Sequence, residues 1–194
     1  PRENKKMVTD LIGNEKMHYV EPKHKMVLLD RMWDLAHAVK EQLIIDVTYK
    51  SNYSSNLVVR KLKPVGIMFS EFYFYLTAFI VKDGEEQDNL CPTIYRIDRI
   101  VDMVTSNEHF RVPYAERFEE GEFRKRIQFM YNGELRKIKF LYKGTNVEAV
   151  LDRFPTAVVT EETDEGYMIS AEVFGGNGVD MWIRSQGDWV EMVK

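Results

Sequence analysis

The chain has few of the residues that form disulfide bonds or structural metal sites. Its 194 residues include one cysteine, Cys91, so no disulfide can form within the chain, and we expect a reducing compartment, the cytoplasm. The four histidines, His18, His24, His37 and His109, show no metal-ligand spacing with one another or with that cysteine. We therefore expect neither a metal nor another cofactor.

Long hydrophobic runs are also missing. No apolar segment approaches the roughly 20 residues that a membrane-spanning helix needs, and no signal-peptide core follows the polar start at residues 1–6. We expect no membrane partner. The chain begins at Pro1 without methionine, which processing and excision from a longer polypeptide explain equally well.

Recognisable enzyme motifs are absent. The sequence has no Gly-x-Ser-x-Gly, no paired catalytic carboxylates and no cysteine and histidine nucleophile setting, and Cys91 beside Pro92 is typical of a small strand-edge residue. The glycine-rich run at residues 175–178 lacks both the Lys-Ser/Thr of a Walker loop and the dinucleotide-binding spacing. That run favours a tight turn over a phosphate cradle, and we expect no enzymatic activity.

What is present is the composition of an ordinary globular protein, with 44% hydrophobic and 30% charged residues. The net charge of −4 argues against non-specific coating of DNA, so any anion must meet a local basic patch. Residues 1–25 read as a polar connector. Residues 26–43 follow with helical spacing of apolar side chains, which predicts an amphipathic helix. Its apolar set is Leu28, Leu29, Met32, Leu35, Ala36, Val39 and Leu43.

The periodicity then changes to two, which predicts strands over 43–49, 57–65, 72–81 and 93–105, the last being one strand or a pair. Residues 50–56 have the composition of a hairpin loop, and Asp83-Gly84 marks a turn. Residues 43–105 therefore predict a small, mostly antiparallel sheet or barrel of about five strands.

A charged stretch at 111–126 reads as a connector to a second unit. That unit predicts strands at 134–142, 157–163, 167–174 and 188–193 and helices at 147–154 and 179–185, which is an α+β sandwich of ferredoxin-like type. Thr145 and Glu148 have the spacing of a capping box, and Gly187 lies where the last helix should end. The three tryptophans are expected to anchor packing, although Trp33 with the face around Met32 and Leu35 is also suited to a partner helix in a dimer.

Arginines and tyrosines stand inside the strand-like segments of the first unit, at Arg60, in Phe74-Tyr75-Leu76 and in Tyr95-Arg96-Ile97-Asp98-Arg99-Ile100. A buried guanidinium requires a carboxylate, a phosphate or comparable acceptors. The pattern indicates a site for an anionic ligand.

These motifs, in the order helix, β-rich unit and α+β tail, resemble the WYL-domain transcriptional regulators from residue 35 onward. Trp-Tyr-Leu is matched by Phe74-Tyr75-Leu76, and Thr93 stands where many relatives have a further arginine. The resemblance implies a linker and helix start at 1–34, an Sm-like (SH3-like) β-barrel at 35–112, a connector at 113–126 and a C-terminal extension at 127–194. It also implies a helix-turn-helix DNA-binding domain preceding both units, outside this chain.

The resemblance implies that Arg60 and Arg96 present guanidinium forks to phosphate oxygens while Tyr75 adds a hydroxyl and a stacking face. Arg96 has an alternative, an ordinary ion pair with Asp98. Arg99 joins the pocket only if a bulge or strand end separates it from Arg96. Tyr49 is either another aromatic wall or an inward core residue.

The function that follows is the effector-sensing and dimerisation portion of a bacterial DNA-binding transcriptional regulator. We expect it to bind a nucleic-acid or nucleotide-like ligand in the barrel, to form a homodimer, and to meet operator DNA through the preceding domain. One alternative is a non-sensing dimerisation or scaffold module, and a weaker one is a hydrolase on a barrel scaffold.

Overall fold

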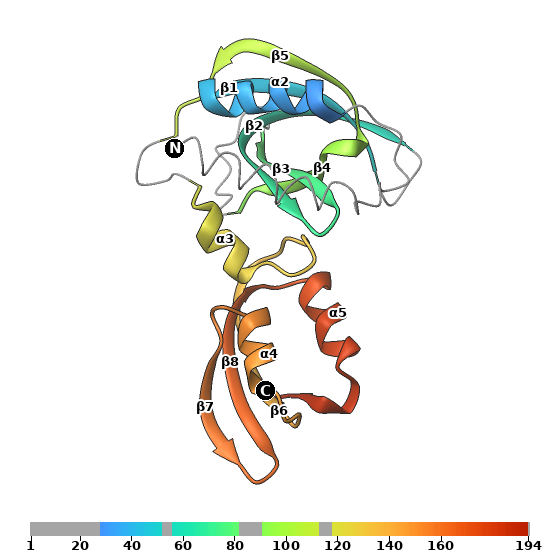
Figure 1. Ribbon diagram of the computed structural model, residues 1–194. Helices are drawn as coiled ribbons and strands as arrows, with labels where there is room; N and C mark the ends of the chain where they lie inside the picture. The colour runs from blue at the N-terminus through green and yellow to red at the C-terminus, as the bar shows by residue number, and fades with distance from the viewer. Residues whose placement is uncertain (1–27, 52–55, 82–90, 113–117, 194) are drawn as a thin grey trace, which may run out of the picture.

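The computed structural model describes residues 28–51, 56–81, 91–112 and 118–193 (Figure 1). Within them the chain is a mixed α+β protein with two antiparallel sheets and four helices, of which the sequence predicts three. The predicted connector at residues 1–25 and the Asp83-Gly84 turn lie outside these residues. None of the described helices is long and apolar enough to cross a membrane.

The first unit is one helix on a five-stranded sheet. Helix α2 spans Leu28–Glu41, and the strand order in the sheet is β4-β3-β2-β1-β5. The strands and the one-turn 3-10 helix η1 have these bounds: β1 Leu43–Lys50, β2 Leu57–Ser70, β3 Tyr73–Ile80, β4 Thr93–Arg96, η1 Ile97–Arg99 and β5 Ile100–His109.

The buried stripe of α2 is narrower than predicted. Leu35 and Ala38 are fully buried against the sheet, and Val39 packs beside them. Ala36 is exposed and Trp33 is 75% exposed. Trp33 therefore anchors no packing in this unit, because on a helix it lies about 200° around the axis from Leu35.

The sheet curls because its two edge strands are neighbours in sequence. β4 and β5 lie at opposite edges, yet only the three residues of η1 connect them. The edges must therefore approach each other at η1. Among the described strands β4 and β5 do not pair, so the sheet is open and curled, whereas the sequence predicts a barrel.

Strand β2 is five residues longer than predicted and bends at a bulge between Pro64 and Gly66. Pro64 has no backbone N–H to pair, which suits an interrupted ladder. Beside it the Thr77 hydroxyl donates to the Gly66 carbonyl at 3.0 Å. A Cβ on Gly66 would lie 2.9 Å from the Thr77 oxygen, so glycine permits this close approach.

The second unit places two helices on one face of a four-stranded sheet of order β7-β8-β6-β9 (Figure 1). Its core joins the inner face of the sheet to both helices, with Phe140, Phe154 and Trp182 in mutual ring contact. The elements are β6 Leu135–Tyr142, α4 Val147–Arg153, β7 Val158–Thr163, β8 Gly166–Phe174, α5 Asn177–Ser185, the 3-10 helix η3 Gly187–Trp189 and β9 Val190–Met192.

The helix ends follow the predictions in part. The N-cap of α4 is Asn146, whose side chain accepts from the Ala149 N–H at 3.3 Å. The predicted capping box at Thr145 is therefore wrong by one residue, because asparagine caps at least as well as threonine. Gly187 follows the end of α5 with φ +57°, the left-handed conformation that favours glycine.

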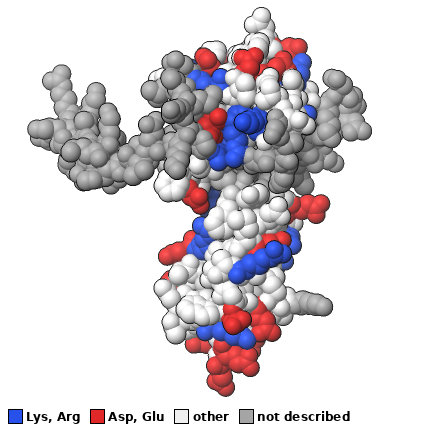
Figure 2. All heavy atoms as spheres, turned by 90° about the vertical axis from the view of Figure 1, so that its right-hand side faces the viewer, with Lys and Arg blue, Asp and Glu red and all other residues white. Residues whose placement is uncertain are grey.

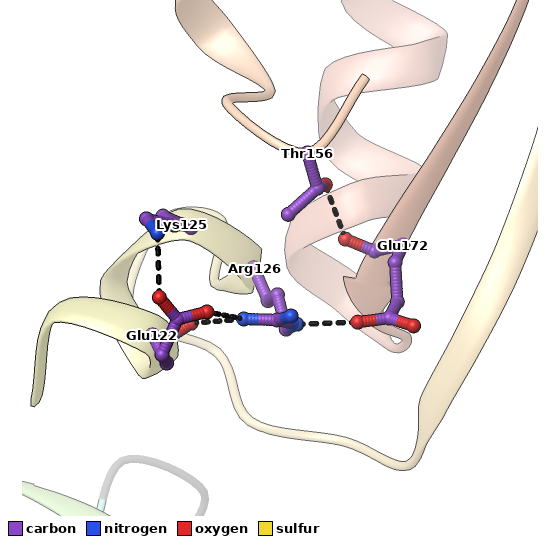
Figure 3. Close-up of polar contacts among 5 residues, drawn as sticks. All are labelled: Glu122, Lys125, Arg126, Thr156 and Glu172. Atoms are coloured by element: carbon purple, nitrogen blue, oxygen red, sulfur yellow. Dashed lines mark hydrogen bonds and ion pairs between the residues drawn. The ribbon is translucent and has the colours of Figure 1, made fainter. Parts of the chain in front are cut away.

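The predicted connector at 113–126 contains a helix, α3, at Glu120–Arg126. Figure 3 shows how α3 is attached to the second unit. Arg126 donates to Glu172 on β8 at 2.6 Å and to Glu122 at 2.7 Å. Thr156 donates to the Glu172 carbonyl at 2.6 Å. Charged residues of this predicted connector therefore form an ion-pair network with β8.

The two units also meet directly. Met68 of the first sheet packs in one cluster with Phe123 and Ile127, and Phe174 of β8 joins them. Asn132 donates to the Pro92 carbonyl at 2.6 Å, and the Cys91 thiol donates to Asn132 Oδ1 at 2.9 Å. The start of β4 is thereby tied to the second unit.

Candidate functional site

Two of the predicted site residues, Tyr49 and Tyr75, meet Arg96 where β4 ends, and Arg99 follows on η1. Ladder geometry stops at Arg96, and η1 turns the chain before β5 begins. This strand end is the irregularity that the Arg99 prediction required. The charges of both Arg99 and Arg96 now act on the hydroxyl of Tyr49.

Tyr49 is an inward-facing core residue, which is one of its two predicted interpretations, and its hydroxyl reaches the end of β4. Its ring packs against the core and meets Tyr95 edge to face at 5.1 Å. Its hydroxyl accepts the Arg96 backbone N–H at 3.2 Å. Burial raises the pKa of Tyr49, and Arg99 and Arg96 oppose that rise. The residue links the end of β1 to β4 across the opening of the curled sheet.

Arg60 lies on β2, opposite Val47 of β1 in the strand register. It is exposed on β2, and its Nη1 donates to the neighbouring Val59 carbonyl at 3.2 Å. Burial raises the pKa of Tyr95 to about 12, and the charge of Arg60 acts against that rise.

Arg96 is engaged by Asp98. Its Nε donates to Oδ1 at 3.0 Å and its Nη2 to Oδ2 at 2.6 Å, which is a bidentate pair. The two side chains are only 16% and 6% exposed. The guanidinium also lies over the Tyr73 ring, 3.5 Å from its centroid. The ion pair that the sequence left open is present, so this fork is not open to solvent as the ligand hypothesis assumed.

Arg99 differs from its neighbour. Its Nη1 is buried and has no hydrogen-bond partner in the described part of the chain. A buried donor without an acceptor costs about 1–3 kcal/mol, and more when it is charged. Arg60, Arg96, Arg99 and Asp98, which we call the arginine cluster, thus comprise three guanidinium groups and one buried carboxylate, which is paired with Arg96.

Aromatic side chains form one wall of the arginine cluster. Tyr75 lies opposite Arg96 in the β3–β4 register, and its ring is 6.5 Å from that of Tyr73. Burial raises the pKa of Tyr75, whereas Arg96 lowers it. Tyr73 and Tyr95 were not predicted as site residues. The alternation that places Tyr73 on the face of Tyr75 was the available signal.

Other candidate regions lack such convergence. Cys91 is half-buried, and burial raises the pKa of its thiol to about 11, so it is not an activated nucleophile. The glycine run packs against another loop, because a Cβ on Gly133 would meet the Gly175 carbonyl oxygen at 1.3 Å. No group of three or more metal-binding side chains occurs in the described residues.

Two further regions are unsuited to an anion. A cavity of about 160 Å³ has mainly apolar walls, and none of the predicted site residues lines it. It is lined by Val39, Gln42, Pro64, Val65, Phe110, Val112 and Phe118. Figure 2 shows acidic side chains gathered at the far end of the second unit, where the β7–β8 hairpin exposes four carboxylates at residues 161–165. That end repels polyanions.

Comparison with known proteins finds a family match within the first unit. Residues 30–105 match the WYL domain. A CRISPR Cas-related protein shares the fold, with a TM-score of 0.55 at 16% identity over 87% of this chain and 48% of that one. Proteasome accessory factor B/C (PafBC) of Arthrobacter aurescens aligns at a TM-score of 0.41 and 13% identity, over 84% of this chain and 24% of its own. The chain therefore spans about half and a quarter of their lengths, and no curated protein matches its sequence.

Proposed function

We propose, from the match of residues 30–105 to the WYL domain, that this chain is the effector-sensing and dimerisation portion of a bacterial DNA-binding transcriptional regulator. Residues 35–112 act as an Sm-like sensor module, 113–126 connect it, and 127–194 form a ferredoxin-like extension. A DNA-binding domain outside this chain contacts the operator. The chain carries out no chemistry on its ligand.

The observation that carries this proposal is the buried, unpartnered Nη1 of Arg99 beside Tyr49. Folding desolvates a charged donor there without giving it an acceptor, and a ligand oxygen supplies one. Phosphate suits the position because it offers several acceptors and a negative charge. The ligand is therefore nucleotide-like, a short single strand or a nucleotide, with Tyr75 available for base stacking.

Sensing requires that the ligand prefer one of two arrangements of the protein. The arginine cluster lies at the end of β4, and the start of β4 is hydrogen-bonded to Asn132 of the second unit. A ligand that shifts β4 would therefore change how the two units meet. This short strand is the physical link between binding and its effect.

The proposal is tested by titrating this chain into a fluorescein-labelled oligothymidylate of about ten nucleotides at several salt concentrations. Affinity should fall as salt rises, because phosphate contacts release counterions. Arg99→Ala should weaken binding at least about tenfold and flatten the salt dependence.

The matched control is Arg136→Ala, which removes the same charge from an exposed arginine paired with Asp180 in the second unit. It should bind like the parent. Melting temperatures of all three proteins establish that they are folded. Undetectable or salt-independent binding by the parent, or equal effects of the two variants, would reject the sensing function.

Two observations favour a second candidate, a dimerisation or scaffold module that senses nothing. The bond between Arg96 and Asp98 satisfies one arginine internally, and Trp33 exposes 75% of its surface on α2. Sedimentation equilibrium separates the candidates. A stable dimer that loses self-association in Trp33→Ala and binds no oligonucleotide indicates the scaffold.

A further inference from the structure

Asp98 occupies the position at Arg96 that a ligand anion would take. Its two carboxylate oxygens meet Nε and Nη2 of the guanidinium at 3.0 and 2.6 Å. A phosphate binds an arginine through the same two parallel hydrogen bonds. The carboxylate is 6% exposed, so water does little to screen its charge from the site.

The three arginines therefore differ in what they can offer a ligand. Arg99 holds a buried donor without an acceptor, Arg60 is exposed on β2, and Arg96 is already engaged by Asp98. An anion at Arg99 gains that free donor. To gain Arg96 as well, the anion must displace a buried carboxylate, which would then be left without its main partner.

From this geometry we infer that the Asp98 carboxylate competes with a ligand phosphate for Arg96 and thereby sets the affinity of the site. Arg99 is the anchoring cation, and the ion pair of Arg96 and Asp98 carries no net charge. The inference rests on the proposed function, since it concerns the same site. It assigns Asp98 the role of a specificity residue that weakens the binding of phosphate ligands. Monophosphates and short single strands are then held reversibly, as a sensor requires.

Two variants test this role with the labelled oligothymidylate. Asp98→Asn keeps the shape of the side chain but removes its charge, so it should bind about tenfold tighter. Its salt dependence should be steeper by about 0.7, the value for one added phosphate contact on a single strand. Asp102→Asn is the matched control, because it removes an exposed carboxylate on β5 and should leave affinity unchanged.

The double variant Arg96→Gln/Asp98→Asn removes the pair while keeping two side chains that can hydrogen-bond each other. It should bind like the parent, because a self-compensated pair adds no net charge. A loss of tenfold or more in this variant would show that Arg96 already holds the ligand and would overturn the inference. Equal affinity of Asp98→Asn and the parent would overturn it as well.

The outcomes separate this inference from the function on which it rests. If the parent binds and Asp98→Asn binds no tighter, only the competitor role fails. If the parent and every folded variant bind nothing, the sensing function fails. Because a buried substitution can affect folding, each melting temperature is compared with that of the parent, and the double variant retains a test of the role if Asp98→Asn alone unfolds.

Discussion

At the scale of single residues, the buried phenol of Tyr95 makes the stability of the first unit depend on pH. Burial raises the pKa of its phenol from 10.0 to about 12, and Arg60 only partly opposes that rise. The native state therefore holds the phenolic proton more tightly than the unfolded chain does. Stability from this source is fully present below pH 10 and is lost as the pH rises toward 12.

The free energy of unfolding should consequently fall between pH 10 and 12 by an amount on the order of 2–3 kcal/mol from Tyr95. Tyr95→Phe should lose this part of the decline, measured by urea unfolding at stepped pH. The Cys91 thiol, whose pKa burial raises from 9.0 to about 11, adds a decline that both proteins share. The difference between the two curves isolates Tyr95, and parallel curves would contradict the assignment.

At the scale of elements, the end of α2 carries local strain. Gln42 follows the last residue of the helix with φ +54°, the left-handed conformation that costs a residue with a Cβ about 1–2 kcal/mol. Its backbone is held there, because its N–H donates to Val39 and its carbonyl accepts from Phe110. The direct passage from α2 into β1 requires this conformation.

Gln42→Gly should raise the free energy of unfolding by up to about 1 kcal/mol, because glycine adopts this φ without a steric penalty. Gln186→Gly is the opposite case at the end of α5. Gln186 has φ −81° and ψ −14°, where glycine brings only its entropic cost, so the same substitution should destabilise by about 0.5–1 kcal/mol. Two shifts of equal sign in denaturant unfolding would contradict this explanation.

At the scale of the whole molecule, the arrangement of the two units depends on a few contacts. Asn132 accepts from the Cys91 thiol and from the Gly133 N–H, and it donates to the Pro92 carbonyl. A small apolar cluster around Met68 and Phe123 lies beside this amide. Such a limited interface allows the units to change their relation.

Asn132→Ala should leave both sheets folded but loosen their junction, at a cost of about 1–2 kcal/mol for the lost hydrogen bonds. Hydrogen exchange should accelerate at residues 91–96 and 128–133 and remain unchanged in the core of the second unit. Asn177→Ala, at an exposed position on α5, is the control and should be neutral. Uniform acceleration across the chain would show a general loss of stability.

The local elements were predictable because they depend on local pattern. Alternation with a period of two located the strands of both units, although β2 runs five residues further than predicted. Gly187 marked the end of α5 because glycine favours the left-handed conformation found there. The helix in the charged connector was missed, since α3 has only seven residues and is held by contacts to Glu172, 46 residues away from Arg126. The packing role predicted for Trp33 was wrong, because helical spacing does not show where the neighbouring sheet ends, and its alternative role at a dimer interface stays a prediction.

The sequence by itself determined the WYL resemblance, the two α+β units and the five residues proposed for the site, because residue type and period are written in the chain. Only the tertiary structure decided how those residues are used. It curled the first sheet, ended β4 at Arg96, paired that arginine with Asp98 and left a donor of Arg99 buried without an acceptor. The physical reason is that burial and the choice of partner arise from distant segments meeting in space, which no local pattern records.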